Sequence, residues 1–215
     1  MNRIEELLSV GSEALGAQLK KMPKFLEQYA LGPELLQMLQ QKNGFYAFEH
    51  ALHVFPSQSD ITGVVTFEEW NSDTLWRNAY QGLADNLAFF AEDAFGDQFC
   101  LSDKVRGVLR FVAETAETQL VAGSIESWAD RILTNYELET GWPFAHQWQA
   151  KHGRLAFGQR LQPKIPFIYG GEYDLENLWA GDAVKGMLFK GELAVKVKDL
   201  PEGTQVRLQV KEPEN

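Results

Sequence analysis

The chain has 215 residues and a formal net charge of −10 at pH 7. Its 45% hydrophobic content suits a soluble globular core, and no apolar run approaches the roughly 20 residues of a membrane-spanning helix. A single cysteine excludes an intrachain disulfide and a cysteine-based zinc site, and the N-terminus lacks a signal-peptide core. We therefore expect a cytoplasmic protein without a membrane segment.

The N-terminal part of the chain is predicted to be helical. Apolar residues at helical spacing predict a helix over residues 3–21, followed by a short helical turn over 23–29. Pro33 suits the first turn of a second helix, because its missing N–H costs nothing there. Asn43 and Gly44 end that helix.

The middle of the chain is predicted to form a sheet. A continuously apolar run indicates a buried strand over 87–91, and a second strand is expected over 98–101. Gly96 and Asp97 between them are typical of hairpin turns. The remaining predictions here are one or two strands over 45–55, a strand over 62–67, a helix over 71–80 and a strand over 104–112.

The C-terminal part is predicted to mix helices and strands. Ser124 is expected to cap a helix that carries an apolar stripe from Ile125 to Leu133. A further helix is expected to begin at Trp142 and to close at Gly153. After it we expect short strands over 167–169 and 175–180, a segment over 182–197 that fits a helix despite two glycines, and an edge strand over 205–210.

Several of these features together resemble the SUKH superfamily, named partly for Smi/Knr-type regulators of yeast cell-wall synthesis. Its bacterial members are mostly immunity proteins against secreted polymorphic toxins. The resemblance covers roughly residues 33–135 and rests on Asn43-Gly44-Phe45 after a helix, Trp76 and Tyr80 before the strand pair, Ala91 to Asp97, Ser124 to Trp128, and Asp130 to Leu133. Phe95-Gly96-Asp97 also resembles a Phe-Gly-Asp segment in the core of a type VI immunity family.

The resemblance implies an α+β fold with a single, mainly antiparallel central sheet flanked by helices. We divide the chain into an N-terminal helical segment (1–32), a SUKH-like core (33–135) and a C-terminal extension that packs on the same body (136–215). The implied function is a non-enzymatic protein-interaction module, an immunity protein that neutralises a secreted toxin by direct binding. A regulatory or scaffold protein of the same fold is the alternative.

The acidic charge is concentrated in the region that carries the resemblance. Residues 49–140 hold sixteen acidic and five basic residues. Such a field repels nucleic acid and speeds association with basic partners, and nuclease toxins are often basic. We therefore predict a basic protein toxin, with nucleases as one candidate class, although acidity for solubility alone remains an equal interpretation. The candidate partner-binding residues are Glu68, Glu69, Asp73, Asp85, Glu92, Asp93, Asp97 and Asp103.

No catalytic, cofactor-binding or metal-binding residue is predicted. His50 and His53 have a spacing that suits a metal on a helix, but residues three apart on a strand point to opposite faces. Cys100 lies in an apolar strand, where cysteine usually behaves as a small hydrophobic residue. A small hydrolase that uses the acidic hairpin is a further alternative, but no nucleophile–base pair supports it.

Overall fold

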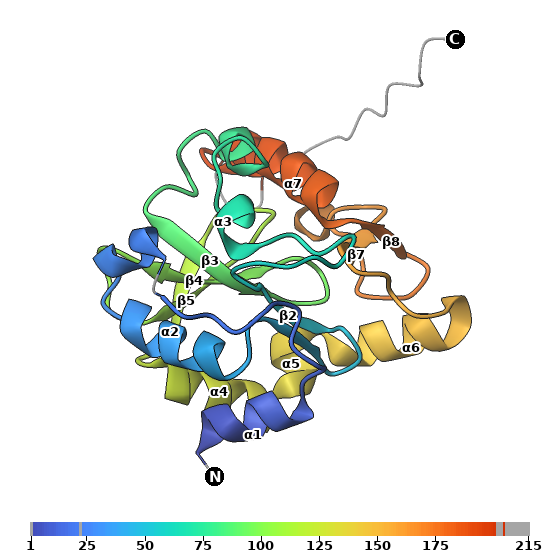
Figure 1. Ribbon diagram of the computed structural model, residues 1–215. Coiled ribbons are helices and arrows are strands. Elements are labelled where there is room, and N and C mark those ends of the chain that lie inside the picture. The colour runs from blue at the N-terminus through green and yellow to red at the C-terminus, as the bar shows by residue number, and fades with distance from the viewer. Residues whose placement is uncertain (1, 22, 201–203, 205–215) are drawn as a thin grey trace.

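The main feature of the computed structural model, which describes residues 2–21, 23–200 and 204, is an antiparallel sheet whose strands follow one another in chain order (Figure 1). The expected α+β fold with a mainly antiparallel central sheet is confirmed, and a separate two-stranded sheet accompanies it. The central strands are β1 (Phe45–Ala47), β2 (Leu52–Val54), β3 (Leu87–Glu92), β4 (Gln98–Ser102), β5 (Val108–Phe111) and β6 (Thr118–Ala122). The second sheet pairs β7 (Gln159–Pro163) with β8 (Leu178–Asp182).

Helices cover both faces of the central sheet (Figure 1). Those described are α1 (Arg3–Val10), α2 (Gly32–Gln41), α3 (Phe67–Trp70), α4 (Ile125–Thr134), α5 (Tyr136–Thr140), α6 (Trp142–His152) and α7 (Ala183–Val197). Short 3₁₀ segments are η1 (Lys24–Gln28), η2 (Arg77–Tyr80) and η3 (Phe167–Tyr169). None of the described helices has the length and apolar character needed to cross a membrane.

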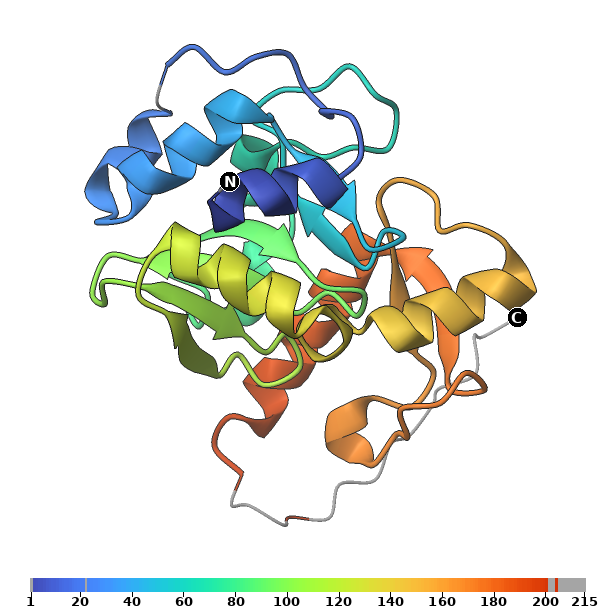
Figure 2. The same cartoon turned by 90° about the horizontal axis from the view of Figure 1, so that it is seen from below.

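The continuously apolar sequence of β3 is explained by contacts on both faces of the sheet. Phe89 packs against Trp76 beside η2, with ring centroids 5.1 Å apart. Phe90 packs on the other face against Trp128 of α4, at 5.0 Å. Figure 2 shows α4 lying beside α1, and the two helices contact each other. The strand therefore needs apolar side chains at successive positions.

The C-terminal extension contacts the central sheet near the end of β3. Leu161 of β7 donates its backbone N–H to Ala94 O at 2.8 Å. Helix α7 returns across the molecule to pack on η2, so closely that a Cβ on Gly191 would lie 2.7 Å from Tyr80 Cδ2. Gly191, one of the two glycines in this predicted helix, is therefore required for the contact. The helix prediction over 182–197 is confirmed.

The helix predicted over 3–21 is wrong beyond Gly11. The Ser12 N–H donates to Tyr46 O at 2.7 Å, and the Gly16 N–H donates to Asn43 O at 3.0 Å. A Cβ on Gly16 would lie only 1.9 Å from Gln58 O. Because of these long-range hydrogen bonds, residues 12–16 lie beside the start of the sheet and do not continue the helix.

Other local predictions also need correction. Residues 62–66 form a loop rather than a strand, because Thr66 and Glu69 make a capping box that starts α3. The helix predicted over 71–80 is reduced to η2, and residues 167–169 form η3 rather than a strand. Strand β6, helix α5 and strand β7 were not predicted. The strand predicted over 205–210 lies outside the described residues.

Candidate partner-binding site

The eight acidic residues predicted to bind a partner do not form one surface. Glu92 and Asp93 are each only 1% exposed, and Asp97 is partly buried. The prediction of Glu92 and Asp93 as partner-binding residues is therefore wrong, because their side chains are not at the surface. The exposed members are Glu68, Glu69, Asp73, Asp85 and Asp103.

Glu92 is buried because an arginine from the C-terminal extension neutralises it. Arg160 Nη2 lies 2.8 Å from Glu92 Oε1, and His53 Nδ1 lies 3.0 Å from the same oxygen. Burial alone would raise the pKa of Glu92, but Arg160 and hydrogen bonds from His53 and Gln98 bring this pKa below its ordinary value. Glu92 is therefore an ionised carboxylate that joins the central sheet to the extension.

Asp93 organises the turn between β3 and β4. Its Oδ1 accepts backbone N–H groups from Phe95 and Asp97, at 2.9 and 3.0 Å. Its other oxygen binds Arg110, which also lies 3.4 Å from Asp97. Burial raises the pKa of Asp93, while Arg110 opposes this shift. The acidic hairpin is thus explained by buried ion pairs and turn hydrogen bonds.

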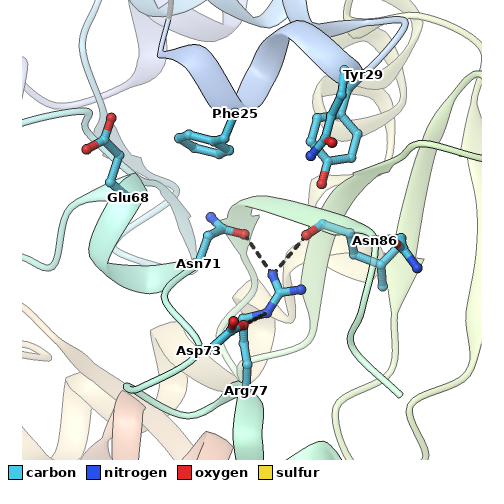
Figure 3. A pocket seen from close by; sticks show the side chains of 9 residues that line it. Phe25, Tyr29, Glu68, Asn71, Asp73, Arg77 and Asn86 are labelled. Carbon is cyan, nitrogen blue, oxygen red and sulfur yellow. Dashed lines mark hydrogen bonds and ion pairs between the residues drawn. The ribbon is translucent and has the colours of Figure 1, made fainter. Parts of the chain in front are cut away.

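Two of the exposed acidic residues line an open pocket of about 360 Å³. Figure 3 shows Glu68 and Asp73 at its border, with the aromatic rings of Phe25 and Tyr29 facing Arg77. The remaining lining residues are Gln28, Asn71, Asn86 and Leu87. We call these nine residues the acidic pocket. It is formed by η1, α3, η2 and the turn that precedes β3.

The acidic pocket has a fixed floor. Asn71 ends α3, and its side chain both donates to Phe89 O and accepts the Phe89 N–H, each at 2.8 Å. Arg77 donates to Leu87 O at 2.9 Å and to Ala84 O at 2.6 Å. The Asn71 and Arg77 side chains thus bind the loop and η2 to the edge of β3.

Negative charge dominates this pocket. Arg77 is the one basic residue among those that line it, and its guanidinium is bound to backbone carbonyls and lies 3.5 Å from Asp73. Asp85 precedes Asn86, and the Asp103 N–H donates to Asn86 O at 3.3 Å, so two further exposed carboxylates flank the pocket. Glu69 lines a different cavity. The arrangement suits a cationic group with an apolar stem, as in lysine or arginine.

The two histidines lie in different backbone settings: His53 is on β2, whereas His50 is in the turn that precedes this strand. Phe48, Glu49 and His50 all have positive φ angles, of 50°, 53° and 69°, in the turn between β1 and β2. This left-handed turn places the His50 ring 4.3 Å from the phenol ring of Tyr46, between ring centroids. His53 is the cross-strand neighbour of Tyr46 in the β1–β2 pair and stacks on the same ring at 4.1 Å. Among the described residues no group of three or more possible ligands could hold a metal ion.

Cys100 is fully buried, and burial raises the pKa of its thiol well above the ordinary value. The described geometry therefore gives it no nucleophilic character. The sequence reasoning also missed Asn71, Arg77 and Arg160. Their roles depend on backbone carbonyls and on contacts between distant segments, for which the sequence carries no local signal.

Comparisons with known proteins agree with this fold. The model of the SMI1/KNR4 family (SUKH-1) matches residues 14–131, more than half of the chain. Among solved structures, the crystal structure of Atu4351 from Agrobacterium tumefaciens is similar, with a TM-score of 0.56 and 12% sequence identity. The match covers 87% of this chain and 88% of that chain, and at this identity it shows the fold alone. No curated protein sequence matches this chain.

Proposed function

Because the chain belongs to the SMI1/KNR4 family (SUKH-1), we propose that it is a non-enzymatic interaction module whose acidic pocket binds a basic protein. The specific role that we propose is immunity, in which the chain neutralises a secreted toxin by direct binding in the cytoplasm. The family membership supports an immunity or regulatory role, and the acidic pocket supports a basic partner.

The observation that carries this proposal is the exposure of carboxylates around a pocket with aromatic walls. Asp73 is 80% exposed on its side chain although it lies 3.5 Å from Arg77, so most of its charge faces solvent. Phe25 and Tyr29 supply apolar surface next to it. A partner's lysine or arginine could place its stem against these rings and its charge near Glu68 and Asp73.

The proposal that the protein is not an enzyme is supported by the ion pairing and burial of the candidate catalytic side chains. Glu92 and Asp93 are bound to arginines, and Cys100 is fully buried. A general acid or base must reach its substrate, and these three side chains have almost no exposed surface. A hydrolase that uses the acidic hairpin is therefore not favoured.

The test is to co-express the chain with the product of the gene immediately upstream of its own. We expect a toxic product, a stoichiometric complex and restored growth. The double variant Glu68→Lys and Asp73→Lys should lose rescue, whereas Glu117→Lys, an exposed reversal after β5, should retain it. Complete rescue by the double variant would reject the acidic pocket as the binding site. A harmless neighbouring product, with altered cell-wall synthesis on deletion of the chain, would favour the regulatory role.

A further inference from the structure

A pocket of about 280 Å³ lies where helix α7 packs against the two-stranded sheet of the C-terminal extension. The sheet provides Gln162 and Trp179, which are direct partners in the β7–β8 pair, so their side chains lie on the same face. Helix α7 provides Lys185 and Phe189, which lie one turn apart on one side of the helix. None of the described lining residues belongs to the acidic pocket.

The aromatic side chains of this pocket are open to solvent. Trp179 is 50% exposed and Phe189 is 53% exposed. Neither ring packs against another aromatic ring among the described residues. Exposed aromatic side chains that line one pocket are typical of binding sites, because a bound molecule removes their apolar surface from water.

Gln162 provides a polar group at the base of the pocket. It is only 6% exposed, and its side-chain amide makes no hydrogen bond to any described group. Both amide atoms nevertheless retain accessible surface, in contrast to Oε1 of Glu114 in the same pocket, which is fully buried. The amide lies against the backbone of α7, where a Cβ on Gly186 would be 2.4 Å from Nε2. An amide fixed in this way has a donor and an acceptor available to a ligand.

Positive charge is more abundant than negative charge around this pocket. Its ionisable lining residues are Lys164, Lys185, Lys190, Glu114 and Asp182. Lys190 Nζ donates to Phe95 O, and Lys164 Nζ donates to Glu176 O at 2.6 Å. Lys185 is exposed, and its ammonium group pairs with no described carboxylate. The Lys185 ammonium is therefore available to an anionic group.

The two acidic residues oppose an anion only in part. Asp182 Oδ1 accepts the Lys185 N–H at 2.9 Å and so caps the first turn of α7. Glu114 is 5% exposed, its Oε2 accepts the Ile168 N–H at 2.8 Å, and burial raises its pKa. The pocket also lies at the N-terminal turn of a 15-residue helix, whose dipole favours negative charge.

We propose that this pocket binds a small aromatic carboxylate, whose ring lies against Trp179 and Phe189 and whose carboxylate group lies beside the Lys185 ammonium. The Gln162 amide supplies a donor and an acceptor for a further polar group of the ligand. The assignment does not depend on the proposed immunity role, because the acidic pocket is formed by other residues and suits the opposite charge.

Three soluble probes that share one ring provide a direct test: indole-3-acetate is anionic, indole-3-acetamide is neutral and tryptamine is cationic. The full chain is titrated with each, and the indole N–H resonance of Trp179, identified by its loss in Trp179→Phe, is followed by NMR. Indole-3-acetate should shift this resonance and saturate with a Kd on the order of 1 mM or below, as expected for so small a ligand. Indole-3-acetamide should bind at least about threefold more weakly, because Lys185 attracts only the charged probe. Tryptamine should bind most weakly of the three.

Matched variants place the binding. Lys185→Gln should remove the preference for indole-3-acetate over indole-3-acetamide, whereas Lys151→Gln, at an exposed position of α6 outside the pocket, should retain it. Phe189→Ala should weaken both probes by at least about fivefold, the equivalent of one aromatic contact. Leu138→Ala, at a position of α5 that is 79% exposed, should not weaken them.

Circular dichroism checks that all four variants remain folded. Equal affinity for the anionic and neutral probes would overturn the proposal, since it would show an apolar surface that does not recognise charge. Tighter binding of tryptamine, or absence of saturable binding by indole-3-acetate, would also overturn it. The same holds for a preference that survives Lys185→Gln in a folded protein.

Discussion

Glu92 and Asp93 are adjacent in sequence, yet their buried carboxylates bind arginines from different parts of the chain: Arg160 of β7 and Arg110 of β5. Glu92, the last residue of β3, is therefore connected to the C-terminal extension. Asp93, the next residue, is connected to β5 of the central sheet. Neither carboxylate is free to contact a partner.

Reversal of one of these charges should destabilise the protein severely. Glu92→Lys would place an ammonium group beside Arg160 at a fully buried position, and breaking a buried ion pair costs about 3–5 kcal/mol. Asp85→Lys, an exposed reversal, should change stability by less than about 0.5 kcal/mol. Urea denaturation of both variants gives the comparison. Equal stabilities would contradict the structural role assigned to Glu92.

The β3–β4 hairpin should depend on Phe99. This side chain is fully buried, packs against Trp128 with ring centroids 5.6 Å apart, and lies beneath the Arg110 guanidinium. Phe99→Ala should cost about 3–5 kcal/mol of unfolding free energy, the range for deletion of a core aromatic side chain. Leu120→Ala, at a site 55% exposed on β6, serves as the control and should cost far less. A loss below about 1 kcal/mol for Phe99→Ala would contradict its central position.

Acidification should weaken the protein through His53. Burial lowers its pKa from 6.5 to about 4 in the folded state, so between these values the unfolded chain binds more protons. Stability from this group is present above pH 6.5 and is lost as the pH falls toward 4. The difference in unfolding free energy between wild type and His53→Gln should therefore shrink by about 2 kcal/mol between pH 7 and pH 5.

Asp93 acts in the opposite direction, because its pKa is raised in the folded state and its contribution falls as the pH rises. The comparison with His53→Gln is needed for this reason, since the wild-type profile alone combines both effects. Denaturation curves at several pH values provide the measurement. Parallel pH profiles for the two proteins would mean that His53 is not held neutral by burial.

The acidic pocket should set how fast a basic partner associates. Reversal of Glu68 and Asp85 to lysine should lower the association rate by about tenfold at low salt, because exposed charges steer encounter at long range. The effect should fade at physiological ionic strength and above, where the Debye length is about 8 Å or less. Surface plasmon resonance at two salt concentrations measures this. An equal loss for Glu117→Lys would show that net charge, rather than the pocket, is responsible.

The sequence was informative where local chemistry decides the structure. The apolar run from Leu87 to Ala91 and the Ser124 cap predicted β3 and α4 correctly. The failures share a physical cause, which is contact with distant segments. The Gly16 N–H donates to the backbone carbonyl of Asn43, so the predicted helix does not continue to this residue. Glu92 is buried because Arg160 of the C-terminal extension pairs with it. Composition identified the acidic region but could not tell paired carboxylates from exposed ones.

The connectivity of the central sheet also has a consequence for biosynthesis. Strands β1 to β6 pair in chain order, so each strand can pair with the one before it as soon as it leaves the ribosome. Arg160 emerges only after this meander is complete. Until then Glu92 lacks its ion pair with Arg160, and a nascent chain stalled before β7 should form the sheet with His53 as the only described partner of the Glu92 Oε1 atom.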